Sequence, residues 1–183
     1  MRIITGKYRS RNLKSPPSLD VRPSSHRLRE TLFNVIAPRI QGVRFLDLCA
    51  GSGAIGIEAL SRGAAHATFV DRSRKMFALI KANLELFQIS KDEWSVIQAE
   101  ATAFLKQAAR KNESWDIVFC DPPYAIDYLE ILESLATTTS SLLTETGLLI
   151  VEHRHKKELP AEIGNLRRAR LLKQGDSALS FYK

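Results

Sequence analysis

The stretch Phe45-Leu-Asp-Leu-Cys-Ala-Gly-Ser-Gly-Ala-Ile-Gly56 decides the fold of this chain. Its apolar beginning has the character of a buried strand, and it ends in three glycines with the spacing Gly51-x-Gly53-x-x-Gly56. Glycine adopts backbone conformations that other residues avoid, and it lets a ligand approach the main chain closely. The stretch therefore predicts a strand, a sharp ligand-binding turn and the beginning of a helix.

Downstream of this stretch, short apolar runs alternate with longer stretches of helical periodicity. Such alternation is typical of an α/β fold with a mostly parallel sheet. The expected strands are Val43–Leu48, Ala67–Val70, Ser95–Gln98, Ile117–Cys120 and Leu148–Glu152, followed by a closing hairpin of Leu166–Leu172 and Ala178–Tyr182. The expected helices lie near residues 53–62, 73–87, 101–111 and 127–143.

Upstream of the core, the sequence predicts a small extension. Arg2–Thr5 and Tyr8–Leu13 flank Gly6-Lys7, which favours a hairpin. A loop with three prolines follows, and apolar residues from Leu28 to Ile36 then recur at helical spacing until Pro38. We expect Ser24 or Ser25 to cap this helix. The length of 183 residues fits one domain, with an extension of residues 1–41 and a core of residues 42–183.

The net charge of +7 lies entirely in the extension. Residues 1–29 hold eight basic side chains against one acid, Asp20, so the rest of the chain is neutral overall. A positive segment of this kind suits a polyanion, although a solvated basic end that aids solubility is an alternative. The residues that a polyanion such as RNA would contact are Arg2, Lys7, Arg9, Arg11, Lys14, Arg22, Arg27 and Arg29.

The sequence contains no apolar run long enough to span a bilayer and no signal-peptide pattern, so we expect a cytoplasmic protein that does not bind membranes. Two cysteines, Cys49 and Cys120, are too few for a disulfide framework or a zinc quartet. The four histidines show no ligand-like clustering beyond His153-x-His155, which we interpret as a solvated segment beside Lys156 and Lys157, and no metal is expected. We expect a monomer.

Two acidic residues distinguish between candidate cofactors. The glycine spacing also fits a dinucleotide, and Asp71 follows Gly51 by 20 residues, as a ribose-binding acid should. Asp47, however, precedes the glycines at the strand end, where a carboxylate would repel a pyrophosphate but attract a cationic amino-acid group. S-adenosylmethionine is therefore favoured over a nicotinamide or flavin cofactor, with Glu100-Ala101 placed to meet the adenine.

Asp121-Pro122-Pro123-Tyr124 follows the apolar strand Ile117–Cys120 and is the most specific motif in the chain. The prolines fix the backbone torsions, so the Asp121 carboxylate and the Pro122 carbonyl can both accept hydrogen bonds from an exocyclic amine. Tyr124 offers a flat ring for stacking on a base. The motif predicts methylation of an amine on a nucleic-acid base.

These residues resemble the class I methyltransferases and, more narrowly, the RsmD-type 16S rRNA guanine-N2 methyltransferase family. The resemblance is carried by Met1-Arg-Ile-Ile-Thr-Gly-Lys-Tyr-Arg9, Arg22–Asn34, Leu46–Gly53, Glu58–Ala64 and Asp121–Tyr124. It implies a Rossmann-like, seven-stranded, mostly parallel sheet with helices on both faces. It also implies N2 methylation of guanine 966 in 16S rRNA, with the small ribosomal subunit as partner.

The resemblance implies that Asp47, Gly51, Gly53 and Asp71 hold the cofactor, and that Asp121 to Tyr124 hold the guanine amine. With the residues around these positions, the predicted cofactor-binding set is Asp47, Cys49, Ala50, Gly51, Ser52, Gly53, Asp71, Arg72, Glu100 and Ala101. The catalytic set is Asp121, Pro122, Pro123 and Tyr124. The chain departs from the family pattern at four positions, where the family has glycine for Ser10, phenylalanine for Cys49, glutamate for Asp71 and aspartate for Glu100.

Other functions stay open at this point. The same motifs serve enzymes that methylate adenine N6 or a protein amide, although the chain has little room for a separate DNA-recognition domain. A non-catalytic RNA-binding module and a nicotinamide oxidoreductase are the remaining alternatives.

Overall fold

The glycine-rich stretch forms the predicted strand, turn and helix in the computed structural model, which describes residues 1–15, 26–122 and 128–183. Strand β1 (Arg44–Leu48) is buried from Phe45 onward. Gly53 precedes helix α2 (Ala54–Ser61) and adopts a left-handed conformation with φ of +77°, which favours glycine. The wholly buried α2 packs beside strand β2 (His66–Asp71).

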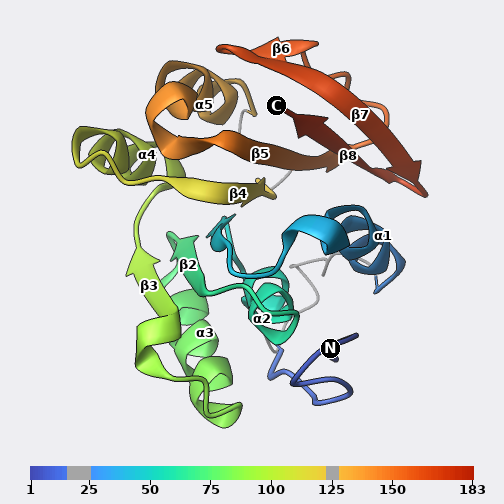
Figure 1. The fold of residues 1–183 in the computed structure, drawn as a ribbon, viewed down its shortest axis with the longest axis vertical. Helices are drawn as coiled ribbons and strands as arrows, with labels where there is room; N and C mark the ends of the chain where they lie inside the picture. The colour runs from blue at the N-terminus through green and yellow to red at the C-terminus, as the bar shows by residue number, and fades with distance from the viewer. Residues whose placement is uncertain (16–25, 123–127) are drawn as a thin grey trace.

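One sheet runs through the molecule (Figure 1), with the strand order β3-β2-β1-β4-β5-β8-β7-β6. Strands β1 to β5 pair in parallel, whereas β6, β7 and β8 are joined to the sheet and to one another by antiparallel pairing. The other strands are β3 (Trp94–Gln98), β4 (Trp115–Cys120), β5 (Leu143–Arg154), β6 (Glu162–Ile163), β7 (Leu166–Gln174) and β8 (Ser177–Tyr182).

Helices cover both faces of the sheet, as predicted. On one face, α1 (His26–Ile36), α2 and α3 (Arg74–Leu86) bury a cluster that includes Phe33 and Phe69. On the other face, α4 (Ala101–Arg110) and α5 (Tyr128–Leu142) pack with Trp115 and Tyr182. Two short 3-10 helices, Ala37–Arg39 and Lys91–Glu93, complete the described elements.

Three details of the prediction need correction. The sheet has eight strands rather than seven, because the two-residue β6 pairs with the beginning of β7. Strand β5 begins at Leu143, five residues before the predicted start. The N-terminal hairpin is present but irregular: Arg2 and Asn12 form one antiparallel bridge, backbone hydrogen bonds join Ile3 to Arg11 and Leu13 to Met1, and the Lys7 N–H bonds instead to Ser61 of α2. The proline loop and the Ser24 or Ser25 cap lie outside the described residues.

No helix among the residues that the structure describes has both the length and the apolar character needed to cross a membrane.

Close packing between α2 and β2 predicts the effect of enlarging Gly56. A Cβ atom there would lie 2.3 Å from Cε1 of Phe69, far inside van der Waals contact. We expect Gly56→Ala to lower the free energy of unfolding by about 1–3 kcal/mol, measured by urea denaturation. Adding Phe69→Leu should recover part of this loss, because the smaller side chain removes the clash. A double variant in which the two costs simply add would contradict the steric explanation.

Candidate functional site

The predicted site residues meet at one edge of the sheet. Because β1 to β4 run parallel, their carboxyl ends lie together, and each is followed by a predicted cofactor or catalytic segment. Hydrogen bonds join these segments. The N–H of Ala50 donates to the Val70 carbonyl at 3.0 Å, and the N–H of Asp121 donates to the Leu48 carbonyl at 3.3 Å. The edge thus brings together residues that are 74 positions apart in the chain, from Asp47 to Asp121.

Asp47 is a buried carboxylic acid at the centre of this edge. Its side chain is 1% exposed, and its Oδ2 accepts a hydrogen bond from the Gly56 N–H at 2.8 Å. Burial raises the pKa of Asp47 to about 8, while the Gly56 hydrogen bond opposes this rise and the charge of Asp71 adds to it. A neighbouring cation would restore the ionised form, so the position favours a ligand that carries positive charge.

Asp71 organises the turn that follows β1. Its Oδ2 accepts from the Gly51 N–H and its Oδ1 from the Ser73 N–H, both at 2.8 Å. Burial raises the pKa of Asp71, and these two hydrogen bonds oppose that rise. Each carboxylate oxygen has further acceptor capacity for a ligand hydroxyl. Helix capping belongs instead to Ser73, whose hydroxyl accepts from Met76.

The glycine turn leaves room where a ligand would approach. A Cβ built on Gly51 would meet no atom within 4 Å, whereas one on Gly53 would press against Ile80. Cys49 adopts a left-handed conformation with φ of +65°, although it is not glycine. The open space at Gly51 lies beside the two acids, so a cofactor fits this turn better than a purely structural role does.

Glu100 and Ala101 stand at the amino end of α4. Glu100 precedes the helix without making a side-chain capping bond, and its carboxylate lies 3.7 Å from the Arg72 guanidinium, with both groups exposed. Ala101 is buried. The exposed Arg72–Glu100 pair can therefore rearrange when a ligand contacts it.

The catalytic motif is described only in part. Asp121 is half-buried directly after β4, and Pro122 is buried. Pro123 and Tyr124 lie outside the described residues, so the stacking role of Tyr124 stays a prediction. Cys120 and Cys49 are free thiols, and a hydrogen bond with Cys49, together with burial, raises the pKa of Cys120.

The predicted RNA-binding residues divide into three groups. Those with exposed side chains are Arg2, Lys7, Arg9, Arg11, Lys14 and Arg27. Arg22 lies outside the described residues. Arg29 is the exception, because its side chain is 2% exposed and donates to the Arg2 carbonyl at 3.2 Å. Its burial against the core argues against a direct phosphate contact, contrary to the prediction from sequence.

Sequence reasoning missed two buried residues that attach the N-terminal segment to the site. Glu58 on α2 accepts hydrogen bonds from the N–H groups of Ile4 and Thr5 at 2.7 and 3.0 Å. Asn83 on α3 accepts from the Lys14 N–H at 2.8 Å, and its Nδ2 donates to the carbonyls of Lys14 and Ser52, both at 3.1 Å. Asn83 thus bridges the basic segment and the glycine turn.

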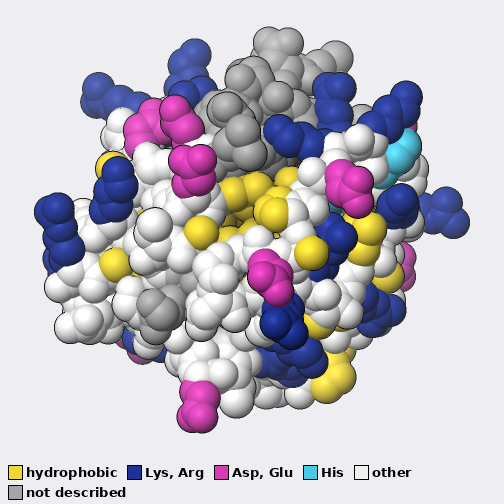
Figure 2. Space-filling model, turned by 90° about the horizontal axis from the view of Figure 1, so that it is seen from above, with side chains coloured by type: hydrophobic (Ala, Val, Ile, Leu, Met, Phe, Trp, Pro, Cys, Tyr) yellow, Lys and Arg dark blue, Asp and Glu magenta, His cyan; other side chains and the backbone are white. Residues whose placement is uncertain are grey.

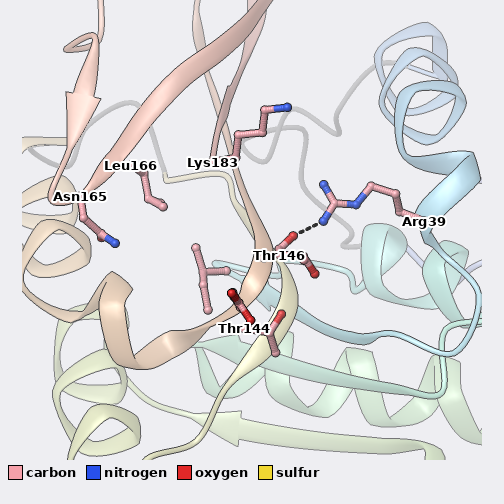
Figure 3. Close-up of a pocket in the computed structure, with 9 residues that line it drawn as sticks. Arg39, Thr144, Thr146, Asn165, Leu166 and Lys183 are labelled. Atoms are coloured by element: carbon pink, nitrogen blue, oxygen red, sulfur yellow. Dashed lines mark hydrogen bonds between the residues drawn. The ribbon is translucent and has the colours of Figure 1, made fainter.

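A pocket of about 750 Å³ lies elsewhere, near the beginning of β5 (Figure 3). Arg39 reaches across its rim to donate to the Thr146 carbonyl, and Lys183 and Asn165 stand opposite. This pocket lies at the amino end of β5, where Leu143 pairs with Trp115, and it contains none of the predicted site residues. Among the described residues, no group of three His, Cys, Asp or Glu side chains could hold a metal ion.

The chain is similar to a described protein family, to curated bacterial proteins and to solved structures. It matches the family described as Conserved hypothetical protein 95 over residues 1–183. It is 39% identical over 165 residues to ribosomal RNA small subunit methyltransferase D of Escherichia coli, covering 90% of this chain and 80% of that protein. It is 37% identical to YlbH of Bacillus subtilis, covering 100% and 98%. The solved Escherichia coli protein yhhF has a similar fold, with a TM-score of 0.85, 35% identity and coverage of 100% and 96%.

The raised pKa of Asp47 predicts how stability depends on pH. In the cofactor-free protein the folded chain keeps this proton up to about pH 8, whereas the ordinary value for aspartic acid is 3.8. The folded state binds more protons in this window, so the free energy of unfolding falls as pH rises through it. Asp47→Asn stays neutral, and we expect a shallower decline and a more stable variant at pH 8.

Urea denaturation at pH 5 and pH 8 measures this difference. Burial also raises the pKa of Asp71, so this residue likewise lowers the free energy of unfolding as pH rises. The contribution is the same in the wild type and in Asp47→Asn, and the comparison between them is unaffected. Glu145→Gln, which removes an exposed carboxylate, is the matched control. A decline as steep in Asp47→Asn as in the wild type would contradict the assignment.

The Asn83 bridge predicts that Asn83→Ala frees the basic segment. The substitution leaves the buried partners of the amide without hydrogen bonds and should lower the free energy of unfolding by about 2 kcal/mol. Limited trypsin digestion should cut after Lys14 faster than in the wild type. Asn12→Ala, at an exposed position of the same segment, is the control. Equal cleavage rates in the two variants would show that Asn83 does not hold this segment.

Proposed function

The chain belongs to the family of ribosomal RNA small subunit methyltransferase D, and from this premise we propose that it methylates the N2 amine of a guanine in 16S ribosomal RNA with S-adenosylmethionine. The observation that carries the proposal is the meeting of Asp47, Asp71 and Asp121 at one sheet edge, around a glycine turn with open space at Gly51.

The cofactor would be held by the glycine turn and the acids beside it. The open side of Gly51 admits the ligand to the main chain, and Asp71 has acceptor capacity for both ribose hydroxyls. Asp47 lies where the cationic amino-acid moiety would stabilise its ionised form. A pyrophosphate would instead keep Asp47 protonated and gain no charge attraction from it, which counts against a dinucleotide.

Asp121 and the Pro122 carbonyl would orient the amine. Two acceptors can hold its two N–H groups, which directs the nitrogen lone pair toward the methyl donor. When bound, S-adenosylmethionine would supply an activated methyl group, with S-adenosylhomocysteine as the leaving group, and the amine proton would pass to the Asp121 carboxylate or to water. In-line placement therefore matters more than strong acid or base catalysis, and Tyr124 would stack on the flipped-out base.

The exposed cations of the N-terminal segment would bind RNA phosphates. These side chains are Arg2, Lys7, Arg9, Arg11, Lys14 and Arg27, and Arg22 completes the proposed set. The cations would position the RNA without reading its sequence, since phosphates carry no base identity. The proposal extends to guanine 966 as the target, and to a monomer of one domain that acts in the cytoplasm.

Methyl transfer tests the proposal directly. Small ribosomal subunits that lack their native guanine methylation are incubated with the protein and tritiated S-adenosylmethionine, and the RNA is digested to nucleosides. Label in N2-methylguanosine is the expected result. Label in N6-methyladenosine would move the activity to another amine, and absence of label with intact cofactor binding would favour a non-catalytic RNA-binding role.

The proposed role of Asp121 predicts that its replacement slows methyl transfer without weakening cofactor binding. Asp121→Ala removes one of the two acceptors for the amine, so we expect at least a hundredfold loss of kcat. Cofactor affinity measured by calorimetry should stay near the wild-type value. Asp116→Asn is the control, because Asp116 lies at the other end of the same strand, where it accepts from the Arg44 N–H. Turnover retained by Asp121→Ala would refute the assigned role.

A further inference from the structure

A second set of cations lies at the catalytic edge of the sheet, on the far side of Asp121 from the glycine turn. Strand β5 runs parallel to β4 with Val151 opposite Cys120, so the chain leaves β5 at the edge where Asp121 lies. The turn after β5 carries Lys156 and Lys157.

The hairpin of β7 and β8 brings a third lysine to the same place. Strand β8 runs antiparallel to β5 with Ser177 opposite Arg154, and Gln174 of β7 lies opposite Ser177. The β7–β8 turn therefore lies next to the turn after β5, and Lys173 stands at its base. The His155 N–H donates to the Asp176 carbonyl at 2.9 Å, which fixes one turn against the other.

All three lysine side chains are exposed. We name Lys156, Lys157 and Lys173 the C-terminal basic corner. The acids nearest in these turns are Glu158 and Asp176, which are also exposed, so the corner keeps a positive excess. Figure 2 views the molecule from above and shows Lys and Arg side chains along its right-hand side, toward which β7 ends in Figure 1.

Helix α1 lies between the N-terminal segment and the C-terminal basic corner. The Thr31 hydroxyl on α1 donates to Oε1 of Gln174 at 2.9 Å, which joins α1 to the end of β7. The Arg29 side chain joins α1 to the N-terminal segment by donating to the Arg2 carbonyl at 3.2 Å. The exposed Arg27 of this helix thus stands between the two groups of cations, on a helix that also exposes the acid Glu30.

Protection of the sheet edge against pairing with other chains is a different explanation for the lysines of the corner. Lysines on an exposed edge strand discourage pairing with other chains, and β7 is covered by only the two residues of β6. This explanation suits Lys173. It does not account for Lys156 and Lys157, because they stand in a turn and not in an edge strand.

We propose that the C-terminal basic corner binds RNA phosphates that flank the target base on the side away from the cofactor. Extruding a base costs unstacking energy, and phosphate contacts on both sides of the base would fix the backbone in the extruded geometry. The N-terminal segment is anchored beside the glycine turn, and the corner lies across Asp121 from it. The inference rests on the proposed function, since it takes guanine in RNA as the substrate.

Charge reversal with a matched control tests the proposal. The variant Lys156→Glu, Lys157→Glu, Lys173→Glu keeps the β7 edge charged, so edge protection survives. The control is Lys106→Glu, Arg110→Glu, Lys111→Glu, three exposed positions on and just after α4 with the same change in net charge. Urea midpoints check that both fold.

The corner variant should raise KM for small subunits by at least about tenfold, and the control should raise it much less. The slope of log RNA affinity against log salt should become shallower by about 2 in the corner variant. Its kcat at saturating RNA and its affinity for S-adenosylmethionine should stay unchanged.

The role of the corner and the proposed methyltransferase function can fail separately, and different results would reveal each failure. Equal KM values and equal salt slopes in the two triple variants would overturn the role of the corner and leave the methyltransferase proposal standing. A wild-type protein without methyl transfer would defeat the proposed function, and the salt slopes for RNA binding would still decide whether the corner contacts RNA.

Discussion

The site depends on one buried hydrogen bond, from the Gly56 N–H of α2 to the Asp47 carboxyl at the end of β1. It ties the strand to the helix across the glycine turn, and the turn can close this tightly because Gly56 packs against Phe69 without a side chain. An acid placed here is costly to ionise, which is why its pKa rises to about 8. A cation bound beside Asp47 would favour its ionised form, and this is the role that we propose for the cationic group of the cofactor.

The N-terminal segment is built onto this unit. Glu58 lies one helical turn after Ala54 and holds the backbone of Ile4 and Thr5, while Asn83 joins Lys14 to the carbonyl of Ser52. The exposed cations of the N-terminal segment therefore lie on a segment that is anchored beside the glycine turn. Under the proposed function, this arrangement would hold the RNA where its target base can reach the methyl donor.

Local patterns were sufficient to predict most of this architecture. The strand ends carrying Asp47, Asp71 and Asp121 follow from periodicity and glycine spacing, and the family resemblance is confirmed by relatives that cover the whole chain. The eighth strand escaped prediction because Glu162–Ile163 is too short to show alternation. The burial of Arg29 also escaped, because a charged residue beside an apolar helical stripe is expected to face water. Hydrogen bonds between residues far apart in the chain, such as those between Asn83 and Lys14, leave no periodic pattern in the sequence.

Backbone conformation explains some departures from the family pattern. Ser10 and Cys49 both have left-handed φ values, +66° and +65°. The resemblance expects glycine at the first of these, where that conformation carries no strain. The chain keeps the turn without glycine, and the bond from the Ser10 N–H to the Ile3 carbonyl at 2.9 Å helps to hold it.

Proton release on cofactor binding tests whether the cationic group of S-adenosylmethionine lies beside Asp47. Calorimetry of S-adenosylmethionine binding in buffers of different ionisation enthalpy measures the protons exchanged. If the cofactor's cationic group lies beside Asp47, binding at pH 7 should release a substantial fraction of one proton. The release should shrink at pH 9, where Asp47 is already ionised, and should be smaller in Asp47→Asn. Binding at pH 7 without proton release, or with the same release in Asp47→Asn, would contradict the account.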